Sequence, residues 1–390
     1  MPHNEQTEKV ASRALFTGEV DSGFLKDASR LLAIPSTHDR PAELQRALAM
    51  IVEILHRFPG FTIEHFDKDG IESILVYFGA TRPQRFKVLL NGHIDVVAAQ
   101  DEQFVPYVDN GRLYGRGALD MKVSALVLVE AFCRTAHLVS YPLGLQIVTD
   151  EEIGGYQGTA YQFSHGVSAD FFITGEQSGN NIGVAAKGIC WLRIVARGTV
   201  SHGAYLWKGD NALLKLTELV RKIHEIYPVP SKEVWETTAS VAQLRSLSEG
   251  HFNRVPDAAE AMIDFRFPGH DVNFVSKEAV REFIASLDSS VEIEFFTFEG
   301  GPITETSHPL LQQLVQVTEK YKPEGVELIR RHAGSDIRHL LDDPLMRGIE
   351  YGVGGANEHS DGEYADLSTV AVMRAALPEF LMTIDPGASS

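Results

Sequence analysis

Three segments in the first half of the chain are continuous apolar runs that end in polar residues. They are residues 86–97 (FKVLLNGHIDVV), 143–152 (LGLQIVTDEE) and 169–176 (ADFFITGE). Runs without alternation of apolar and polar residues are typical of strands buried on both faces of a mainly parallel sheet. Residues 122–138 instead have apolar side chains at helical spacing. The pattern predicts an α/β domain, with a mainly parallel sheet and helices on both of its faces.

The pattern changes at about residue 187, where alternating strands replace the continuous runs. Strands are predicted at 188–198, 235–247, 258–267 and 291–298, and amphipathic helices at 211–227 and 272–287. The resulting order, β-α-β-β-α-β, is that of a ferredoxin-like α+β unit whose antiparallel sheet has one solvated face.

Two later helices, at 309–321 and near 367–377, return the chain to the first domain. We therefore predict a first domain made of residues 1–186 and 300–390. The ferredoxin-like unit, residues 187–299, is inserted into it. Three of the predicted strands of the first domain end in carboxylates or histidine, at the edge of a parallel sheet where ligands bind.

Composition narrows the classes of partner. The 390 residues include 35 Lys and Arg against 53 Asp and Glu, which gives a formal net charge of −18. A field of this sign repels the phosphates of nucleic acids and the headgroups of anionic membranes, so neither is an expected partner. The densest apolar run, 124–132, is too short to span a bilayer.

The location is predicted from the cysteines and the first residues. Cys133 and Cys190 form no CxxC pattern, and we expect buried, reduced thiols. The first twenty residues lack the basic leader and apolar stretch of a signal peptide. Together these features predict a soluble protein of the cytoplasm.

Two groups of polar residues, considered alone, can be explained without a bound metal. His93 and Asp95 are two residues apart at a strand end, so their side chains point to the same side. They fit either a metal ligand with its orienting carboxylate or a satisfied polar pair. Asp120 follows the glycines of GRGALDMK and precedes a helix, so it fits a ligand or a helix N-cap.

Carboxylates also follow the next two strands. Asp150, Glu151 and Glu152 directly continue a buried strand, and adjacent carboxylates repel one another unless a cation is close. Glu176 occupies the same position after the following strand. A solvated loop is the alternative for the triplet, but its place at a strand end favours a cation.

A late glycine-rich loop, GGANEHSDGEYADL, contributes His359 and, four residues later, Glu363. The helix dipole favours a negative charge at the start of the last helix, which would explain Glu363 but not His359. Two histidines and three carboxylates form a ligand set suited to Zn²⁺, with Mn²⁺ or Co²⁺ also possible. Two such ions bridged by one carboxylate polarise a carbonyl and activate water.

The ordered set of these motifs resembles the di-zinc metallopeptidase group of aminoacylase, acetylornithine deacetylase, succinyl-diaminopimelate desuccinylase and glutamate carboxypeptidase. The matching stretches are NGHIDVV, GRGALDMK, TDEEIGG, TGE, SHGA and EHSDGE, and they extend over nearly the whole chain. The resemblance implies a catalytic domain with an inserted lid or dimerisation domain, and two Zn²⁺ ions per subunit.

The resemblance assigns roles to the polar residues at the strand ends. It implies that His93 and Glu176 hold one zinc ion and that Glu152 and His359 hold the other. Asp120 bridges the two ions. Asp95 matches the carboxylate that orients a ligand, and Glu151 matches the general base that takes a proton from the attacking water and passes it to the departing amine.

The resemblance also assigns residues of the inserted domain. His202, in SHGA, matches a histidine that reaches the active site of a partner subunit in relatives that dimerise, where it stabilises the oxyanion. From spacing alone, a surface histidine is an equal alternative. Asn253 and Arg266 match residues that bind the substrate carboxylate, for which Arg has the suitable bidentate geometry. Gly334 and Ser335 offer a backbone and a hydroxyl partner to the substrate.

The predicted function is hydrolysis of the amide bond of an N-acyl amino acid by a zinc enzyme that acts as a homodimer. The alternative within the same class is a carboxypeptidase or dipeptidase that acts on short peptides next to a free carboxylate. A nucleotide-binding Rossmann-type protein is a more distant alternative, because only Gly115 and Gly117 of its glycine motif are present. A catalytically silent metal-binding scaffold is disfavoured by the intact Glu151.

Overall fold

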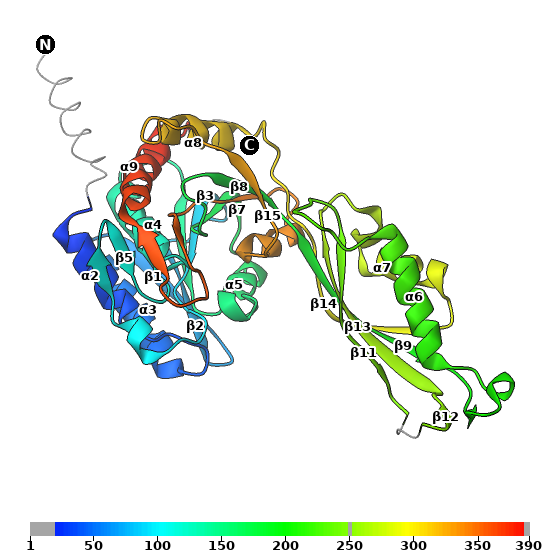
Figure 1. Ribbon diagram of the computed structural model, residues 1–390. Helices are drawn as coiled ribbons and strands as arrows, with labels where there is room; N and C mark the ends of the chain where they lie inside the picture. Colours follow the sequence, from blue (N-terminus) through cyan, green and yellow to red (C-terminus); the bar gives the residue numbers. More distant parts are fainter. Residues whose placement is uncertain (1–19, 249–251, 386–390) are drawn as a thin grey trace, which may run out of the picture. The chain divides into compact units, whose positions relative to one another are not determined.

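Figure 1 shows the computed structural model of the protein, which describes residues 20–248 and 252–385. The chain divides into two compact units. Unit 1 comprises Met1–Val184, Thr304–Ile329 and Ser335–Ser390, and unit 2 comprises Ala185–Ile303 and Arg330–Gly334. Unit 2 therefore contains the predicted insertion, 187–299, together with the short segment 330–334. Of the first twenty residues, in which we expected no signal peptide, only Val20 lies within the described part.

Unit 1 is built on an eight-stranded sheet that is parallel at its centre and antiparallel towards its edges. The parallel strands β6, β3, β7 and β16 are neighbours, so the carboxyl ends of the three predicted apolar strands meet at one edge. In sheet order the strands are β1 (Phe61–Lys68), β2 (Ile71–Phe78), β6 (Leu143–Val148), β3 (Phe86–His93), β7 (Ala169–Thr174), β16 (Arg347–Glu350), β8 (Ile182–Ala186) and β15 (Leu328–Arg331).

Helices cover both faces of this sheet. One face and its helices form a single apolar core. Within it, the helix α4 (Lys122–Thr135) packs against β3 and β6. On the other face Phe172 of β7 stacks edge-on against Phe163 of α5 (Thr159–Ser164). The helices of the first face are α2 (Ser22–Leu32), α3 (Pro41–Leu55), α4 (Lys122–Thr135), α8 (Pro309–Glu319) and α9 (Leu367–Thr383). The predicted α/β architecture is confirmed.

A small antiparallel sheet in the same unit carries two loops that reach the site described below. It consists of β17 (Gly355–Ala356), β18 (Tyr364–Asp366), β5 (Arg112–Tyr114) and β4 (Tyr107–Asp109). The loop after β5 leads to Asp120, and the loop between β17 and β18 carries His359. The loop that leads to Asp120 needs a glycine at position 117. Its φ is +83°, and residues with a Cβ avoid this region.

Unit 2 is a four-stranded antiparallel sheet in the order β11-β13-β9-β14, covered on one face by two helices. The chain order is β9 (Gly188–Arg197), α6 (Ala212–Ile226), β11 (Thr238–Ser246), β13 (Ala258–Phe267), α7 (Lys277–Leu287) and β14 (Glu292–Glu299). This confirms the predicted ferredoxin-like order. A two-stranded ribbon, β10 (Ser201–His202) paired with β12 (Arg254–Val255), belongs to the same unit.

The boundaries of one predicted helix were wrong. The segment 272–287 is not continuous, because residues 272–274 form a 3₁₀ turn and α7 begins only after Ser276. The Ser276 hydroxyl accepts a hydrogen bond from the backbone N–H of Ala279, which caps the helix start. The sequence pattern showed the apolar spacing but not the cap within it.

Both cysteines are buried free thiols, as expected. Cys133 lies in the core of unit 1 and Cys190 in that of unit 2. Burial raises the pKa of each thiol to about 12, so neither is a reactive thiolate near neutral pH. Among the helices of residues 20–248 and 252–385, none is long and apolar enough to cross a lipid bilayer.

We expect Glu130→Ala to destabilise unit 1, because it removes the main partner of a buried arginine. Arg374 of α9, whose side chain is 1% exposed, donates to both carboxylate oxygens of Glu130 on α4 at 2.7 Å. Breaking such a buried pair costs roughly 3 kcal/mol, against less than about 1 kcal/mol for an exposed pair. Thermal denaturation of Glu130→Ala and of the exposed control Glu53→Ala measures the difference. Equal melting temperatures for the two variants would contradict the expectation.

Candidate metal centre

The carboxyl ends of β3, β6 and β7 bring together the residues that the sequence patterns singled out. His93 is the last residue of β3 and pairs in register with Val148 at the end of β6. Glu151 and Glu152 follow in a 3₁₀ turn, η2 (Glu151–Ile153). Glu176 follows β7 by two residues. The meeting of these side chains is a direct result of the parallel register.

Asp120 lies between the two histidines. His93 Nε2 is 3.1 Å from Asp120 Oδ1, and His359 Nε2 is 3.1 Å from Asp120 Oδ2. Each carboxylate oxygen therefore faces a different imidazole. Asp120 is not a helix cap, since α4 has Met121 at its N-cap position and no side-chain cap bond. Its arrangement is the one that a carboxylate bridging two ions requires.

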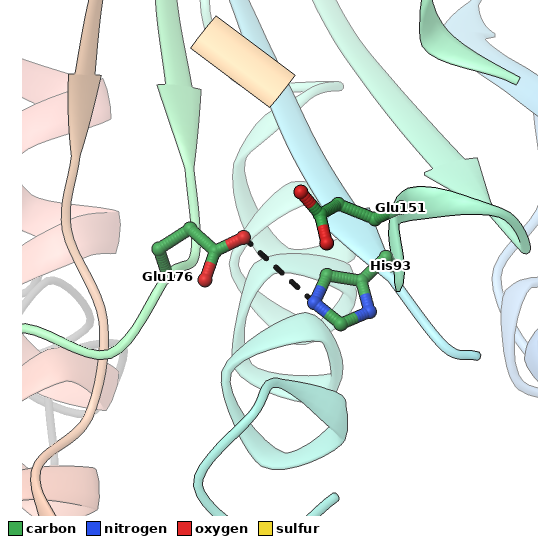
Figure 2. A group of neighbouring side chains, drawn as sticks. All are labelled: His93, Glu151 and Glu176. Carbon is green, nitrogen blue, oxygen red and sulfur yellow. Dashed lines mark ion pairs between the residues drawn. The ribbon is translucent and has the colours of Figure 1, made fainter. Parts of the chain in front are cut away.

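The donor atoms at this edge of the sheet form two groups, and the second includes Asp120. Figure 2 shows the first group, His93, Glu151 and Glu176, in which His93 Nε2 is 3.8 Å from Glu176 Oε1. The second group is Asp120, Glu152 and His359, in which His359 Nε2 is 3.3 Å from Glu152 Oε2. Within each group the donor atoms lie within 4.8 Å of one another.

The donor set fits a pair of divalent ions such as zinc. Ligand atoms about 2.0–2.2 Å from a zinc ion lie roughly 3–4 Å apart, which agrees with the separations of 3.1–3.8 Å given above. Imidazole nitrogens and carboxylate oxygens are also the donor types that zinc accepts. Several carboxylates held this closely need cations to offset their mutual repulsion.

Protonation equilibria reflect this crowding of charge. Burial raises the pKa of Glu176 well above its ordinary value, and the nearby Asp120 charge raises it further. Burial also raises the pKa of Glu151, to about 8. Burial alone would raise the pKa of Asp120, but its hydrogen bonds with His359 and His93 hold it below the ordinary value.

The two histidines respond in the opposite direction. Burial alone would lower the pKa of His93, but hydrogen bonds to Asp120 and Asp95 raise it well above its usual range. Hydrogen bonds to Asp120 and Glu152 raise the pKa of His359 to about 10. The carboxylates thus favour a positive charge beside them. This electrostatic demand is the one that divalent ions would meet.

Asp95 faces the opposite side of the His93 ring. His93 Nδ1 lies 3.1 Å from the backbone oxygen of Asp95 and 3.5 Å from its Oδ1. Asp95 Oδ2 accepts a hydrogen bond from the backbone N–H of Glu152 at 3.0 Å. The carboxylate therefore links the ring of one candidate ligand to the backbone of another, as expected for an orienting residue.

The acidic triplet does not act as a unit. Only Glu151 and Glu152 face the candidate ions. Asp150 is fully buried, and its Oδ2 accepts hydrogen bonds from the backbone N–H groups of Gln157 and Gly158. Asp150 therefore holds the loop after η2. The 3₁₀ turn that begins at Glu151 separates the direction of Asp150 from that of its two neighbours.

Glu363 has a function that the sequence interpretation missed. It does not start the last helix, because α9 begins at Leu367. Its buried Oε1 accepts hydrogen bonds from the backbone N–H groups of Leu119 and Asp120, at 2.9 and 3.2 Å, and its Oε2 pairs with Arg116. Glu363 thus fixes the backbone at Asp120. Its place within EHSDGE, close to His359, was the available signal.

We expect Glu363→Gln to weaken metal binding by about 10–100-fold, the usual effect of removing an outer partner of a metal ligand. The amide would place an N–H group against Arg116 or against the backbone N–H groups of the Asp120 loop. Competition with a chromophoric chelator measures the affinity. The control is Glu379→Gln, a glutamate of α9 that pairs with Lys320. Unchanged affinity in Glu363→Gln would contradict the expectation.

Arg338 is a second residue that the sequence interpretation missed. It lies in a 3₁₀ segment, η5 (Asp336–Asp342), and donates to Glu151 Oε1 at 2.9 Å. No recognised motif pointed to it, since a single arginine nineteen residues after the end of α8 and before β16 has no distinctive spacing.

The remaining predicted residues lie elsewhere in the chain. In unit 2 His202 and Asn253 are exposed neighbours, joined by a hydrogen bond from the backbone N–H of Gly203 to the carbonyl of Asn253 at 2.6 Å. His202 and Asn253 lie near the start of β13. Arg266 lies near its other end, where it pairs with Asp264 at 2.8 Å. Gly334 ends the short segment of unit 2. Ser335, in unit 1, is buried and donates to Glu350.

Comparisons with known proteins find relatives in sequence and in fold. A sequence profile described as peptidase family M20/M25/M40 matches residues 89–383. A succinyl-diaminopimelate desuccinylase of Nitrosococcus oceani is 26% identical over 384 residues, which cover 93% of this chain and all of that relative. The same enzyme of Corynebacterium glutamicum is 26% identical over 361 residues, covering 90% of this chain and 94% of the relative.

Two solved structures share the fold. The aminopeptidase PepT of Bacillus cereus has a TM-score of 0.72 and 17% identity, covering 92% of this chain and 98% of its own. An M20 family metallo-carboxypeptidase of Sulfolobus solfataricus has a TM-score of 0.70 and 15% identity, covering 93% and 99%.

Proposed function

Since the chain belongs to peptidase family M20/M25/M40 and is a hydrolase of amide bonds, we propose that it removes the acyl group from an N-acylated amino acid. The proposal includes a free carboxylate on the substrate and an acetyl- or succinyl-type acyl group. What supports it most is that two relatives covering at least 90% of this chain are named desuccinylases. Family membership also removes the Rossmann-type alternative.

In this proposal two divalent ions, Zn²⁺ by preference, occupy the two groups of donors. His93 and Glu176 would hold one ion, Glu152 and His359 the other, and Asp120 would lie between them. The bound ions supply Lewis-acid polarisation of the amide carbonyl and lower the pKa of water. Glu151 takes the proton of the attacking water and returns it to the departing nitrogen. Asp95 holds the His93 ring in its orientation.

The carboxylate of the substrate would bind to Arg266, Gly334 and Ser335, and to Asn253. Arg266 already forms a two-point pair with Asp264 on the same strand, with donor–acceptor distances of 2.8 and 3.1 Å. A substrate carboxylate would accept hydrogen bonds from the same guanidinium, either together with Asp264 or in its place. His202 would stabilise the oxyanion of the tetrahedral intermediate, and we propose that it does so in the active site of a second copy, in a homodimer formed through the inserted domain. Because Asn253 lies beside His202, at the opposite end of β13 from Arg266, it would come from the same copy as His202. We also propose a cytoplasmic location.

A carboxypeptidase or dipeptidase is the second candidate. It would use the same ions and the same base, with a peptide in place of the acyl group. The observation behind this candidate is that an aminopeptidase and a metallo-carboxypeptidase share the fold of this chain.

One experiment tests the proposal and separates the candidates. Purified protein is analysed for bound metal by mass spectrometry and is then assayed with N-acetyl amino acids, N-succinyl amino acids and dipeptides. We expect about two ions per chain and the highest kcat/KM for an N-acyl amino acid. Preference for dipeptides would support the second candidate, and hydrolysis of none of the three classes would overturn the proposed function.

A further inference from the structure

Arg338 makes two contacts with a single residue, the proposed base. Its Nη2 donates to Glu151 Oε1 at 2.9 Å and lies 3.4 Å from the backbone oxygen of the same residue. The two side chains are only 10% and 12% exposed. The guanidinium therefore fixes both ends of Glu151, in surroundings where a charged pair is well shielded from water.

Glu151 is close enough to the candidate ions to be a ligand itself. One of its carboxylate oxygens lies within 4.8 Å of donor atoms of His93 and Glu176, and Figure 2 shows the carboxylate above the His93 ring. A carboxylate bound to a divalent ion loses most of its basicity, since the ion stabilises the charged form. The same side chain could thus act as ligand or as base, and catalysis requires the second.

The support of Arg338 is independent of the ions. Two residues earlier in η5, fully buried Asp336 accepts hydrogen bonds from Thr159 Oγ1 at 2.5 Å and from Asn91 Nδ2 at 3.3 Å. Asn91 lies on β3, two residues before His93. The start of η5 is therefore attached to the same strand that carries a candidate ligand, which sets Arg338 at a fixed distance from it.

We propose that Arg338 is a positioning residue that keeps Glu151 available as a base by preventing it from becoming a metal ligand. With Oε1 held by the guanidinium, Oε2 would take the proton of the water. This inference rests on the proposed function in that it assumes bound ions and a base. It concerns a residue that neither the motifs nor the comparisons assign.

The test uses the full-length protein loaded with Co²⁺, whose visible absorption weakens when a further ligand raises its coordination number. We expect Arg338→Met to weaken this absorption, to tighten binding of one ion about 10-fold and to lower kcat about 10²-fold. Arg338→Lys, which keeps the charge, should largely restore the absorption, the metal affinity and kcat. The control is Arg85→Met, which removes another partly buried pair, with Asp170, in the same unit.

A double-mutant cycle separates positioning from a structural role. In the Glu151→Gln background, Arg338→Met should change neither the cobalt spectrum nor the metal affinity, because the side chain it restrains no longer carries the charge. Equal spectral changes in both backgrounds, weaker metal binding, or a rise in KM alone would overturn the proposal. The spectral and affinity measurements need no substrate, so failure of the proposed hydrolysis would be recognised separately.

Discussion

Glu151→Gln should lower kcat by about 10³-fold, within the range of roughly 10²–10⁴ for loss of a general base. The amide has nearly the same shape as the carboxylate, and its oxygen can still accept the hydrogen bond from Arg338 that Glu151 Oε1 accepts at 2.9 Å. It cannot take a proton from water. Because substrate and ions are bound by other residues, KM and metal content should stay close to those of the unchanged protein.

Steady-state kinetics on the best substrate, combined with metal analysis of the same preparation, measure both quantities. Glu64→Gln is the matched control, because Glu64 is a partly buried glutamate of the same unit that pairs with Arg82. If Glu151→Gln kept more than about a tenth of kcat, the base would have to be another group. If it lost its metal, Glu151 would be a ligand, and the assignment of its role would be wrong.

The sequence was informative about the candidate site because parallel strands impose a simple geometry. Apolar runs that end in His93, Glu151 and Glu176 had to meet at one edge of the sheet once they were neighbours, and the structure places them there. Asp120 was ambiguous between cap and ligand. Only the three-dimensional position of both histidines shows that each of its oxygens faces a separate imidazole.

Other features depended on contacts between segments far apart in the chain. Glu363 and the backbone of Asp120 are separated by more than 240 residues, and Arg338 and Glu151 by 187. No local spacing encodes such pairs. The strands β1 and β2 were also not predicted. β1 is a half-exposed edge strand, and the apolar run of the mostly buried β2 does not end in carboxylates or histidine. Long-range hydrogen bonding and edge strands are the parts that pattern alone does not specify.

His202→Ala should lower kcat by about 10²–10³-fold, the usual loss when one oxyanion donor is removed. The local structure suits that role. His202 Nδ1 accepts a hydrogen bond from the backbone N–H of Ala204 at 3.1 Å, so the neutral ring carries its proton on Nε2. The exposed nitrogen is thereby set as a donor. His270→Ala, which removes another exposed histidine of unit 2, is the control and should leave kcat unchanged.

Mixing two inactive variants tests whether His202 acts in the active site of a partner. Glu151→Gln supplies an intact His202, and His202→Ala supplies an intact base, so a mixed dimer has one site with both residues and one with neither. Random exchange of subunits should restore about a quarter of the unmodified activity, since about half of the dimers are mixed and each has one complete site. No recovery in a preparation shown to contain mixed dimers would mean that both residues serve the same subunit. A monomer in sedimentation with full activity would contradict the dimer itself.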